Sequence, residues 1–327
     1  MSDTKKVALI VTAVLVVCLI GAGIVIMIAY GGSFPNIFVP LVGTAVTIDE
    51  SEPLRVDGAN QINIDSVIGK VIIQTGQPRA ELTGNVTTNV QKDKYLIVKR
   101  EGGTLAVRFD ANTSYPGYVN GEVTMRIWLP ESMQANVCVT GASANIVVCG
   151  LSFENMTLKS ASGAVSVTDC SGGLLSANSV SGAVRVENAN FERTEIGCTS
   201  GGVVLEGASG DVKINNISGA VRLTDVAGAV YADNVSGSVY LLQQHKDMKQ
   251  IRIGTVSGSV QCVLHERAAF DLSAKSTSGN LATNFDIMVS GEFKNSIVGE
   301  DINGAVNGGG VSVSLTTVSG SIRVDKR

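Results

Sequence analysis

Residues 200–242 have the sequence SGGVVLEGASGDVKINNISGAVRLTDVAGAVYADNVSGSVYLL, and this stretch contains a repeat of nine residues. Each unit begins with a glycine, has a valine two positions later, and has Leu, Ile or Ala four positions later. Apolar residues that alternate with polar ones after a glycine predict one short strand per unit, with one face buried. The expected core positions are Val203, Val212, Val221, Val230 and Val239, and the expected corners are Gly201, Gly210, Gly219, Gly228 and Gly237.

A longer spacing joins these units in pairs. Ser-Gly dipeptides recur at intervals of 19, 19, 18, 18, 21, 21 and 41 residues. We therefore expect an all-β fold in which coils of 18–19 residues, with two strands each, stack as a parallel β-helix (β-solenoid) over residues 131–327. The interval of 41 residues corresponds to about two further coils, and the segments 241–250 and 284–310 interrupt the repeat. The glycines of these Ser-Gly corners are Gly163, Gly182, Gly201, Gly219, Gly237, Gly258, Gly279 and Gly320.

The composition agrees with narrow coils. The chain has 37 glycines but only 6 prolines, and its aromatic content is 5%. Glycine suits tight corners because a Cβ would forbid the backbone angles needed there. Residues 51–130 show strand-like alternation with longer turns. We expect them to form a β-rich cap, since an open end of the stack would expose unpaired strand edges.

One segment is strongly apolar and predicts a transmembrane helix. Residues 7–30 (VALIVTAVLVVCLIGAGIVIMIAY) contain no charge. A helix of this length spans about 36 Å, enough to cross a bilayer. Lys5 and Lys6 precede it, and no Lys or Arg follows before Arg55. The positive-inside rule then places residues 1–6 in the cytoplasm and the chain after residue 30 outside, at the cell membrane.

Residues 7–30 have two alternative interpretations besides a single-pass transmembrane helix, a cleaved signal peptide and a lipoprotein signal. A cleaved signal peptide would use Gly21-Ala22-Gly23 as its small-residue site, although its apolar region is normally shorter than residues 7–30. A lipoprotein would use Cys18, but Val17 is larger than the residue usually found before such a cysteine. In each case residues 31–50 form an apolar linker to the β-rich part.

The segment Arg126-Ile127-Trp128-Leu129-Pro130, followed by Val137-Cys138-Val139 and the Ser-Gly-x-Val units, carries a family resemblance. The chain is similar to the DUF4097 family, bacterial β-strand-repeat proteins often labelled "putative adhesin", over roughly residues 62–327. The resemblance implies a bacterial envelope protein with a parallel β-helix, tethered outside the cytoplasmic membrane of Gram-positive bacteria. It supplies no catalytic motif and no settled activity.

The cysteines follow the strand pattern. Cys170 and Cys262 occupy positions that are apolar in other units, so we expect them to be buried as small hydrophobic residues. Cys138 and Cys149 lie on consecutive strand stretches and could form a disulfide if these stack on neighbouring coils. An odd number of cysteines outside the membrane segment, none with Cys-x-x-Cys spacing, favours free thiols over a disulfide framework.

No catalytic, metal-binding or cofactor-binding constellation emerges. His245 and His265 are the only histidines, and neither has a Cys or His at ligand spacing. Asp225 and Asp233 could approach one another at a corner, as acids do in polysaccharide lyases, but we expect them to be solvated corner residues. His245, Lys246 and Asp247 could form an acid–base pair in the loop 241–250. We therefore predict no catalytic, cofactor or metal residues, and a protein that is not an enzyme.

Two further patterns have structural explanations. Asn216-Ile217-Ser218 and Asn234-Val235-Ser236 match glycosylation sequons, but Asn and Ser both suit corners, which accounts for the match. The net charge is −4, and residues 1–30 contribute +1, which leaves −5 for the remainder. Without a basic stripe, this charge disfavours nucleic acid as a partner.

Three functions remain for a chain of this kind. The leading hypothesis is a non-catalytic cell-envelope protein that acts as an adhesin-like surface binding module, a scaffold or an envelope-stress module. Its partners would be the membrane, a cell-wall polymer, an envelope protein or a second copy. The alternatives are a carbohydrate-active lyase or hydrolase on the same scaffold and a self-assembling structural rod. Tyr231 and Tyr240 occupy equivalent outward positions and are the predicted contact surface.

Overall fold

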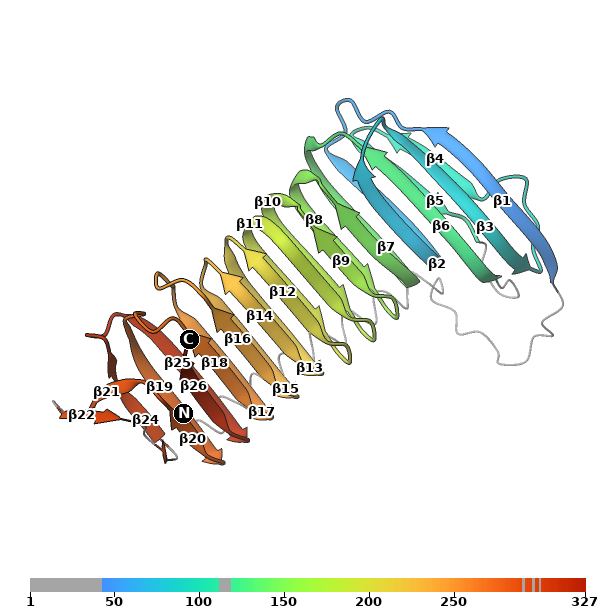
Figure 1. The fold of residues 1–327 in the computed structure, drawn as a ribbon. Helices are drawn as coiled ribbons and strands as arrows, with labels where there is room; N and C mark the ends of the chain where they lie inside the picture. The colour runs from blue at the N-terminus through green and yellow to red at the C-terminus, as the bar shows by residue number, and fades with distance from the viewer. Residues whose placement is uncertain (1–42, 112–118, 290–291, 296–297, 300) are drawn as a thin grey trace. The chain divides into compact units, whose positions relative to one another are not determined.

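The computed structural model describes residues 43–111, 119–289, 292–295, 298–299 and 301–327 (Figure 1). The expected all-β fold is confirmed, because these residues form 26 strands and no helix. No helix that could cross a membrane occurs in this described part of the chain. The predicted membrane segment, residues 7–30, lies outside it.

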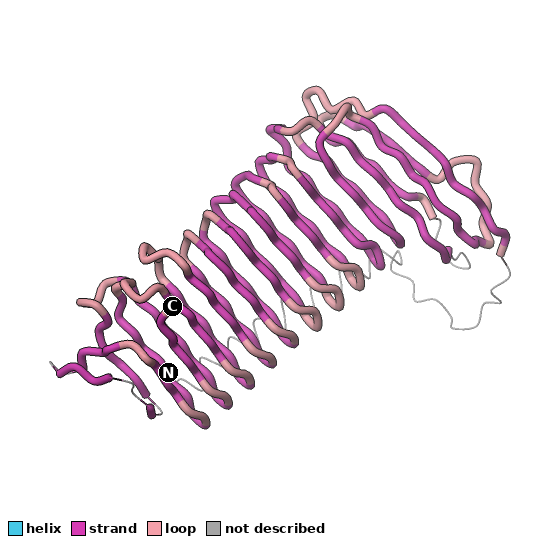
Figure 2. Tube along the Cα trace, viewed as in Figure 1, coloured by secondary structure: helices cyan, strands magenta, loops and turns pink. Residues whose placement is uncertain are grey.

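The described chain divides into two compact units, residues 43–184 and 185–327. This division does not coincide with the expected boundary near residue 130. In each unit most strands run side by side and are joined by short loops (Figure 2). The first unit contains β1 (Thr44–Pro53), β2 (Gln61–Thr75), β3 (Arg79–Thr88), β4 (Leu96–Glu101), β5 (Thr104–Phe109), β6 (Val119–Leu129), β7 (Ser132–Cys149), β8 (Ser152–Ser160), β9 (Val165–Thr168) and β10 (Ser171–Ser179).

In the first unit, parallel stacking begins at β2. β2 pairs in parallel with β7 along nearly its full length, from Gln61 opposite Asn136 to Gln74 opposite Cys149. On its other side β2 pairs in parallel with β5 and β6. The parallel stack therefore extends back to residue 61, inside the range that the sequence assigns to a cap. Antiparallel strands complete this end: β3 pairs with β6, β1 with β3, and β4 with β5.

The second unit is built mainly from two stacks of parallel strands, and antiparallel strands lie at β21–β24. Its strands are β11 (Val184–Cys198), β12 (Val203–Ala208), β13 (Asp211–Ser218), β14 (Val221–Val226), β15 (Val230–Ser236), β16 (Val239–Gln243), β17 (Ile251–Ser257), β18 (Val260–Leu264), β19 (Phe270–Ser278), β20 (Leu281–Thr283), β21 (Asp286–Val289), β22 (Glu292–Asn295), β23 (Val298–Gly299), β24 (Asp301–Val306), β25 (Val311–Ser319) and β26 (Ile322–Lys326). The odd-numbered strands β11, β13, β15 and β17 form one stack, and the even-numbered strands β12, β14, β16 and β18 form the other.

The valine positions define the register of both stacks. Val212 lies opposite Val230 in the odd stack, and Val203 lies opposite Val221 in the even stack, so neighbouring strands are 18 residues apart. This is the spacing expected for coils of a β-solenoid. The five valines Val203, Val212, Val221, Val230 and Val239 are 0–2% exposed. Because both stacks bury their valine rows, the two rows pack against each other and the intervening side chains point outward.

The order of the last coils differs from the expectation. β25 pairs in parallel with β17 on one side and with β19 on the other, and β26 pairs in the same way with β18 and β20. The C-terminal strands therefore lie between two coils that precede them in the sequence. The prediction of two further coils between Gly279 and Gly320 was wrong, since β21–β24 leave the parallel stack and the chain then returns.

The corner glycines are required by close approach between coils. A Cβ on Gly237 would lie 2.3 Å from the carbonyl oxygen of Gly219, and one on Gly228 would lie 2.2 Å from that of Gly210. In the first unit a Cβ on Gly182 would lie 2.2 Å from the carbonyl oxygen of Gly163. Real Cβ atoms do not approach oxygen this closely, so each of these glycines makes room for the same corner of the preceding coil.

A row of small polar side chains lies inside the corners. The residue three positions before a corner glycine points inward and bonds to backbone there. Asn216 Nδ2 donates to Gly219 O at 3.0 Å, and Thr255 Oγ1 donates to Gly258 O at 3.1 Å. In the first unit Ser179 Oγ accepts the N–H of Gly182 at 3.0 Å. These bonds satisfy backbone groups that the turning chain cannot pair with another strand.

Candidate binding surface

The acidic residues considered for catalysis do not converge. Asp225 is tied to the start of a loop, because its carboxylate accepts the backbone N–H of Gln244 at 2.8 Å. Asp233 instead points outward from β15, on the other stack. Among the described residues no group of three or more His, Cys, Asp or Glu side chains could hold a metal ion.

The loop that follows β16 shows no catalytic arrangement either. It is shorter than expected, since β16 extends to Gln243. His245, Lys246 and Asp247 are all exposed. The other histidine, His265, accepts the N–H of Arg267 through Nδ1 at 3.0 Å, which fixes a turn.

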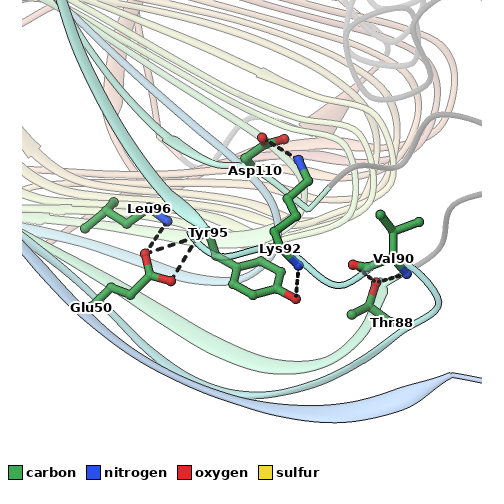
Figure 3. A network of polar contacts seen from close by, with 7 residues as sticks. All are labelled: Glu50, Thr88, Val90, Lys92, Tyr95, Leu96 and Asp110. Carbon is green, nitrogen blue, oxygen red and sulfur yellow. Dashed lines mark hydrogen bonds and ion pairs between the residues drawn. The ribbon is translucent and has the colours of Figure 1, made fainter.

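A network of polar contacts in the first unit closes its antiparallel end (Figure 3). The carboxylate of Glu50 on β1 accepts the N–H of Tyr95 at 2.9 Å and that of Leu96 at 2.7 Å. Nearby, Lys92 forms an ion pair with Asp110, and the Tyr95 hydroxyl accepts the Lys92 N–H. Every contact drawn joins the chain to itself. The network therefore holds β1 against the start of β4 and offers no group for chemistry.

The two tyrosines of the predicted contact surface lie on different stacks. Tyr231 is on β15, opposite Lys213 and Arg252 of the neighbouring strands. Tyr240 is on β16, opposite Arg222 and Gln261. Because the two stacks face each other through their valine rows, their outward side chains lie on opposite faces of the coil. The structure thus places the tyrosines on two surfaces of the second unit instead of one.

Each tyrosine has basic neighbours. The guanidinium of Arg222 lies over the Tyr240 ring, with Cζ 4.6 Å from the ring centroid, which is a cation–π contact. The Tyr231 hydroxyl donates a hydrogen bond to Gln250 Oε1 at 3.1 Å, and its ring stands between the positions of Lys213 and Arg252.

Asp233 lies two residues after Tyr231 on β15 and also points outward. Burial raises the pKa of the Asp233 carboxyl above its usual value, and the nearby charges of Arg252 and Lys213 oppose that effect. In the first unit, burial likewise raises the pKa of Asp65, against the charge of Arg108 and a hydrogen bond with Thr140. Both carboxyls lie at outward positions of their strands and are half-buried there.

A third aromatic site was not predicted from the sequence. Trp128, the only tryptophan, points outward from β6, and the Arg79 guanidinium stacks on it with Cζ 3.8 Å from the ring centroid. Glu81 Oε1 holds Arg79 Nε at 3.0 Å. Gly76 leaves space for the indole, since a Cβ there would lie 2.6 Å from Trp128 Cδ1. The signal was present, because Trp128 alternates with the buried residues Ile127 and Leu129.

The five cysteines of the described chain are free thiols. Cys170 and Cys262 are buried, as is Cys198. Burial raises the pKa of the Cys262 thiol to about 12. Cys138 pairs with Asn63 and Cys149 with Gln74 along β7, so the two thiols lie at different positions on one strand and not on neighbouring coils.

These sites share one chemistry. An aromatic ring next to a guanidinium or ammonium can stack on the apolar face of a sugar while the cation bonds to a phosphate or carboxylate. None of the sites brings a nucleophile and a base together.

The repeated parallel strands, glycine corners and outward aromatic–basic pairs define an all-β repeat protein. The chain belongs to the DUF4097 (Toastrack) family, which matches residues 59–325. No curated protein matches the chain.

Several solved structures resemble this chain at low identity. One is a "putative cell adhesion protein" of Clostridium sporogenes, which is 12% identical, with a TM-score of 0.25 over 86% of this chain and 100% of that one. A "putative adhesin" of Parabacteroides distasonis is 11% identical, with a TM-score of 0.36 over 87% and 98%. A "putative lipid binding protein" of the same species is 12% identical, with a TM-score of 0.38 over 86% and 97%.

Proposed function

We propose that this chain is a non-catalytic β-solenoid protein of the bacterial cell envelope, which binds an acidic cell-wall polymer through its outward aromatic–basic pairs. The observation that carries the proposal is the repeated pairing of an outward ring with a guanidinium. Arg79 lies 3.8 Å from the centroid of Trp128, and Arg222 lies 4.6 Å from that of Tyr240. Two independent outward strands thus present the same combination of groups.

The ring and the cation make different contributions. Stacking of an aromatic ring on a sugar face is an apolar contact and is nearly independent of salt. The guanidinium recognises phosphate or carboxylate, and screening by salt weakens this contact. Binding to an acidic polysaccharide should therefore fall with ionic strength but not vanish.

A sedimentation assay with purified full-length protein tests the proposal. Cell-wall preparations with and without their anionic polymers are incubated with the wild type, Trp128→Ala, Tyr240→Ala and Arg222→Ala. Arg267→Ala, an exposed arginine with no aromatic partner, is the control. We expect a loss of binding of about fivefold for each aromatic variant, from the roughly 1 kcal/mol that such contacts contribute. Equal binding by every variant would refute the proposal.

We also propose that residues 7–30 anchor the protein as a single-pass helix, with the N-terminus in the cytoplasm and the β-rich part outside. The uncharged segment with lysines before it supports this topology. Alkaline carbonate extraction should leave the full-length chain in the membrane pellet. A shorter soluble form that begins near residue 24 or 30 would instead establish cleavage.

The remaining alternatives have their own tests. Release of product from peptidoglycan, teichoic acid or plant polysaccharide, lost in His245→Ala, would make this protein an enzyme. A rod that grows by stacking coils would need a free strand edge at its end. In the second unit the edge of β19 is paired with the antiparallel strand β24, from Phe270 opposite Val306 to Lys275 opposite Asp301. This pairing disfavours growth from that edge.

A further inference from the structure

The strand pair β25 and β26 fills a slot in the second unit. This slot is the gap between β17 and β18 on one side and β19 and β20 on the other. Ile251 to Ser257 of β17 lie opposite Val313 to Ser319 of β25, and Phe270 to Ser278 of β19 lie opposite Val311 to Ser319 on the other side. The inward residues of the inserted pair are almost fully buried: Val313 and Leu315 are 0% exposed, and Ile322 and Val324 are 1% exposed. Residues 311–326 therefore supply an interior coil between two coils that precede them in the sequence.

The coil formed by β19 and β20 is joined to the parallel stack through β25 and β26. Among the described residues, β19 has no pairing with β17, and its partners are β24 and β25 alone. If β25 and β26 leave, β17 and β18 on one side and β19 and β20 on the other expose unpaired parallel edges. Such edges are templates for another strand.

The connection to the inserted pair can change direction. Asn307, Gly308, Gly309 and Gly310 have φ values of 50°, 94°, 77° and 143°. Three consecutive glycines can adopt other backbone conformations at little steric cost. Two hydrogen bonds hold Asn307 in place, from Nδ2 to Glu266 O at 2.9 Å and to Ala268 O at 2.8 Å.

The slot is selective for the segment that fills it. A Cβ on Gly320 would lie 2.2 Å from the carbonyl oxygen of Gly258, and a Cβ on Gly279 would lie 2.0 Å from that of Gly320. An incoming strand pair must therefore have glycine at this corner, with apolar residues at the flanking inward positions. A second copy of this chain carries a segment that meets all these requirements.

We propose that residues 311–327 exchange between two copies of this chain, so that each copy fills the slot of the other and a dimer forms. The strand contacts of the dimer are the same as those of the monomer, and only the path of residues 307–310 changes. Exchange of an identical element is a low-cost route to a dimer, and its extent rises with protein concentration. This inference does not depend on the proposed polymer binding.

A cross-linking experiment with the full chain tests the exchange. Ser257 and Ser319 are exposed register partners in the slot. One copy carries Ser257→Cys and the other Ser319→Cys, both in a Cys149→Ser background that removes an exposed thiol. The two are mixed, partly unfolded in urea, refolded together at high concentration and oxidised. We expect a disulfide-linked dimer on a non-reducing gel, in an amount that increases with the concentration at refolding.

Two matched proteins complete the test. The double variant Ser257→Cys/Ser319→Cys should close its disulfide within one chain when refolded dilute, and this shows that the pair can react. Ser218→Cys, an exposed serine on β13 that does not contact β25, should give no dimer with Ser319→Cys. A reactive double variant together with no dimer from the mixed copies would overturn the proposal, as would equal cross-linking from Ser218→Cys.

Discussion

Asn234 donates a hydrogen bond of 2.9 Å from its side-chain amide to the carbonyl oxygen of Gly237, three residues along the chain. A second bond of 3.2 Å reaches Gly219 O on the preceding coil. Asn234 thus joins two corners, while its side chain is 3% exposed. The sequon that begins at Asn234 is therefore part of the fold, and the amide is inaccessible for modification in the native protein.

Two substitutions of Asn234 should show whether its hydrogen bonds or the volume of its side chain stabilise the corner. Asn234→Ala removes the side-chain donor to Gly237 O, whereas Gly219 O keeps the bond from Asn216 Nδ2, and the loss should lower the free energy of unfolding by about 1–3 kcal/mol. Asn234→Thr should cost less, because Thr255 occupies the equivalent position one coil later and bonds to Gly258 O at 3.1 Å. Urea denaturation of the three proteins measures the difference. Equal stability of the Ala and Thr variants would contradict the hydrogen-bonding role.

Close approach at the corners gives a second prediction. In Gly237→Ala, the new Cβ would lie 2.3 Å from Gly219 O at a residue with φ of 122°. The clash and the disfavoured angle together should destabilise the protein by about 2 kcal/mol or more. Gly202→Ala is the matched control, since its Cβ would come no closer than 3.4 Å to another atom. If both variants melt at the same temperature, close approach does not explain the glycine repeat.

The repeat itself could be predicted because its signal is local. Alternation after each glycine is enough to identify the strands and their inward face, and Asn216 has the same parity as Val212 and Ile214. Because Asn216 is polar, it was not predicted to point inward. The same alternation places Trp128 on the outward face of its strand, but alternation does not indicate that Arg79 of another strand lies over the ring.

The order of the coils could not be predicted, because every coil presents the same pattern. Ser319-Gly320 is followed by Ile322 and Val324, which resemble the corresponding residues of any other unit. Which coil these residues join depends on where residues 284–310 direct the chain, and that segment has no period. The local pattern therefore determines the register of a coil but not its position in the stack.

The register of the second unit can be tested with adjacent residues. Val221 is 1% exposed, whereas Arg222 is exposed and lies over Tyr240. Val221→Asp would bury an unpaired carboxylate, at a cost of about 3–5 kcal/mol. Arg222→Asp should lose only the cation–π contact, about 0.5–1 kcal/mol. Urea denaturation of both variants is the measurement, and similar losses would show that the assigned inward face is wrong.

The pH dependence of stability tests whether burial raises the pKa of Asp233, which lies near Tyr231 on the outward face of β15. Burial raises the pKa of Asp233 above the usual value of 3.8, although Arg252 and Lys213 oppose this shift. Between 3.8 and the raised pKa, the folded protein binds more protons at this site than the unfolded chain does. The contribution of Asp233 to stability therefore decreases as pH rises through this window, and at neutral pH the charged group is unfavourable.

Asp233→Asn removes the titrating group and keeps its shape. We expect the variant to be more stable than the wild type at pH 7, because no charge is then desolvated. The difference should shrink as pH falls through the raised pKa and become small below about pH 3.8, where the wild-type carboxyl is also neutral. Thermal melts of both proteins at pH 3, 5 and 7 give this curve. A variant less stable than the wild type at pH 7 would mean that the attraction of Arg252 and Lys213 outweighs burial.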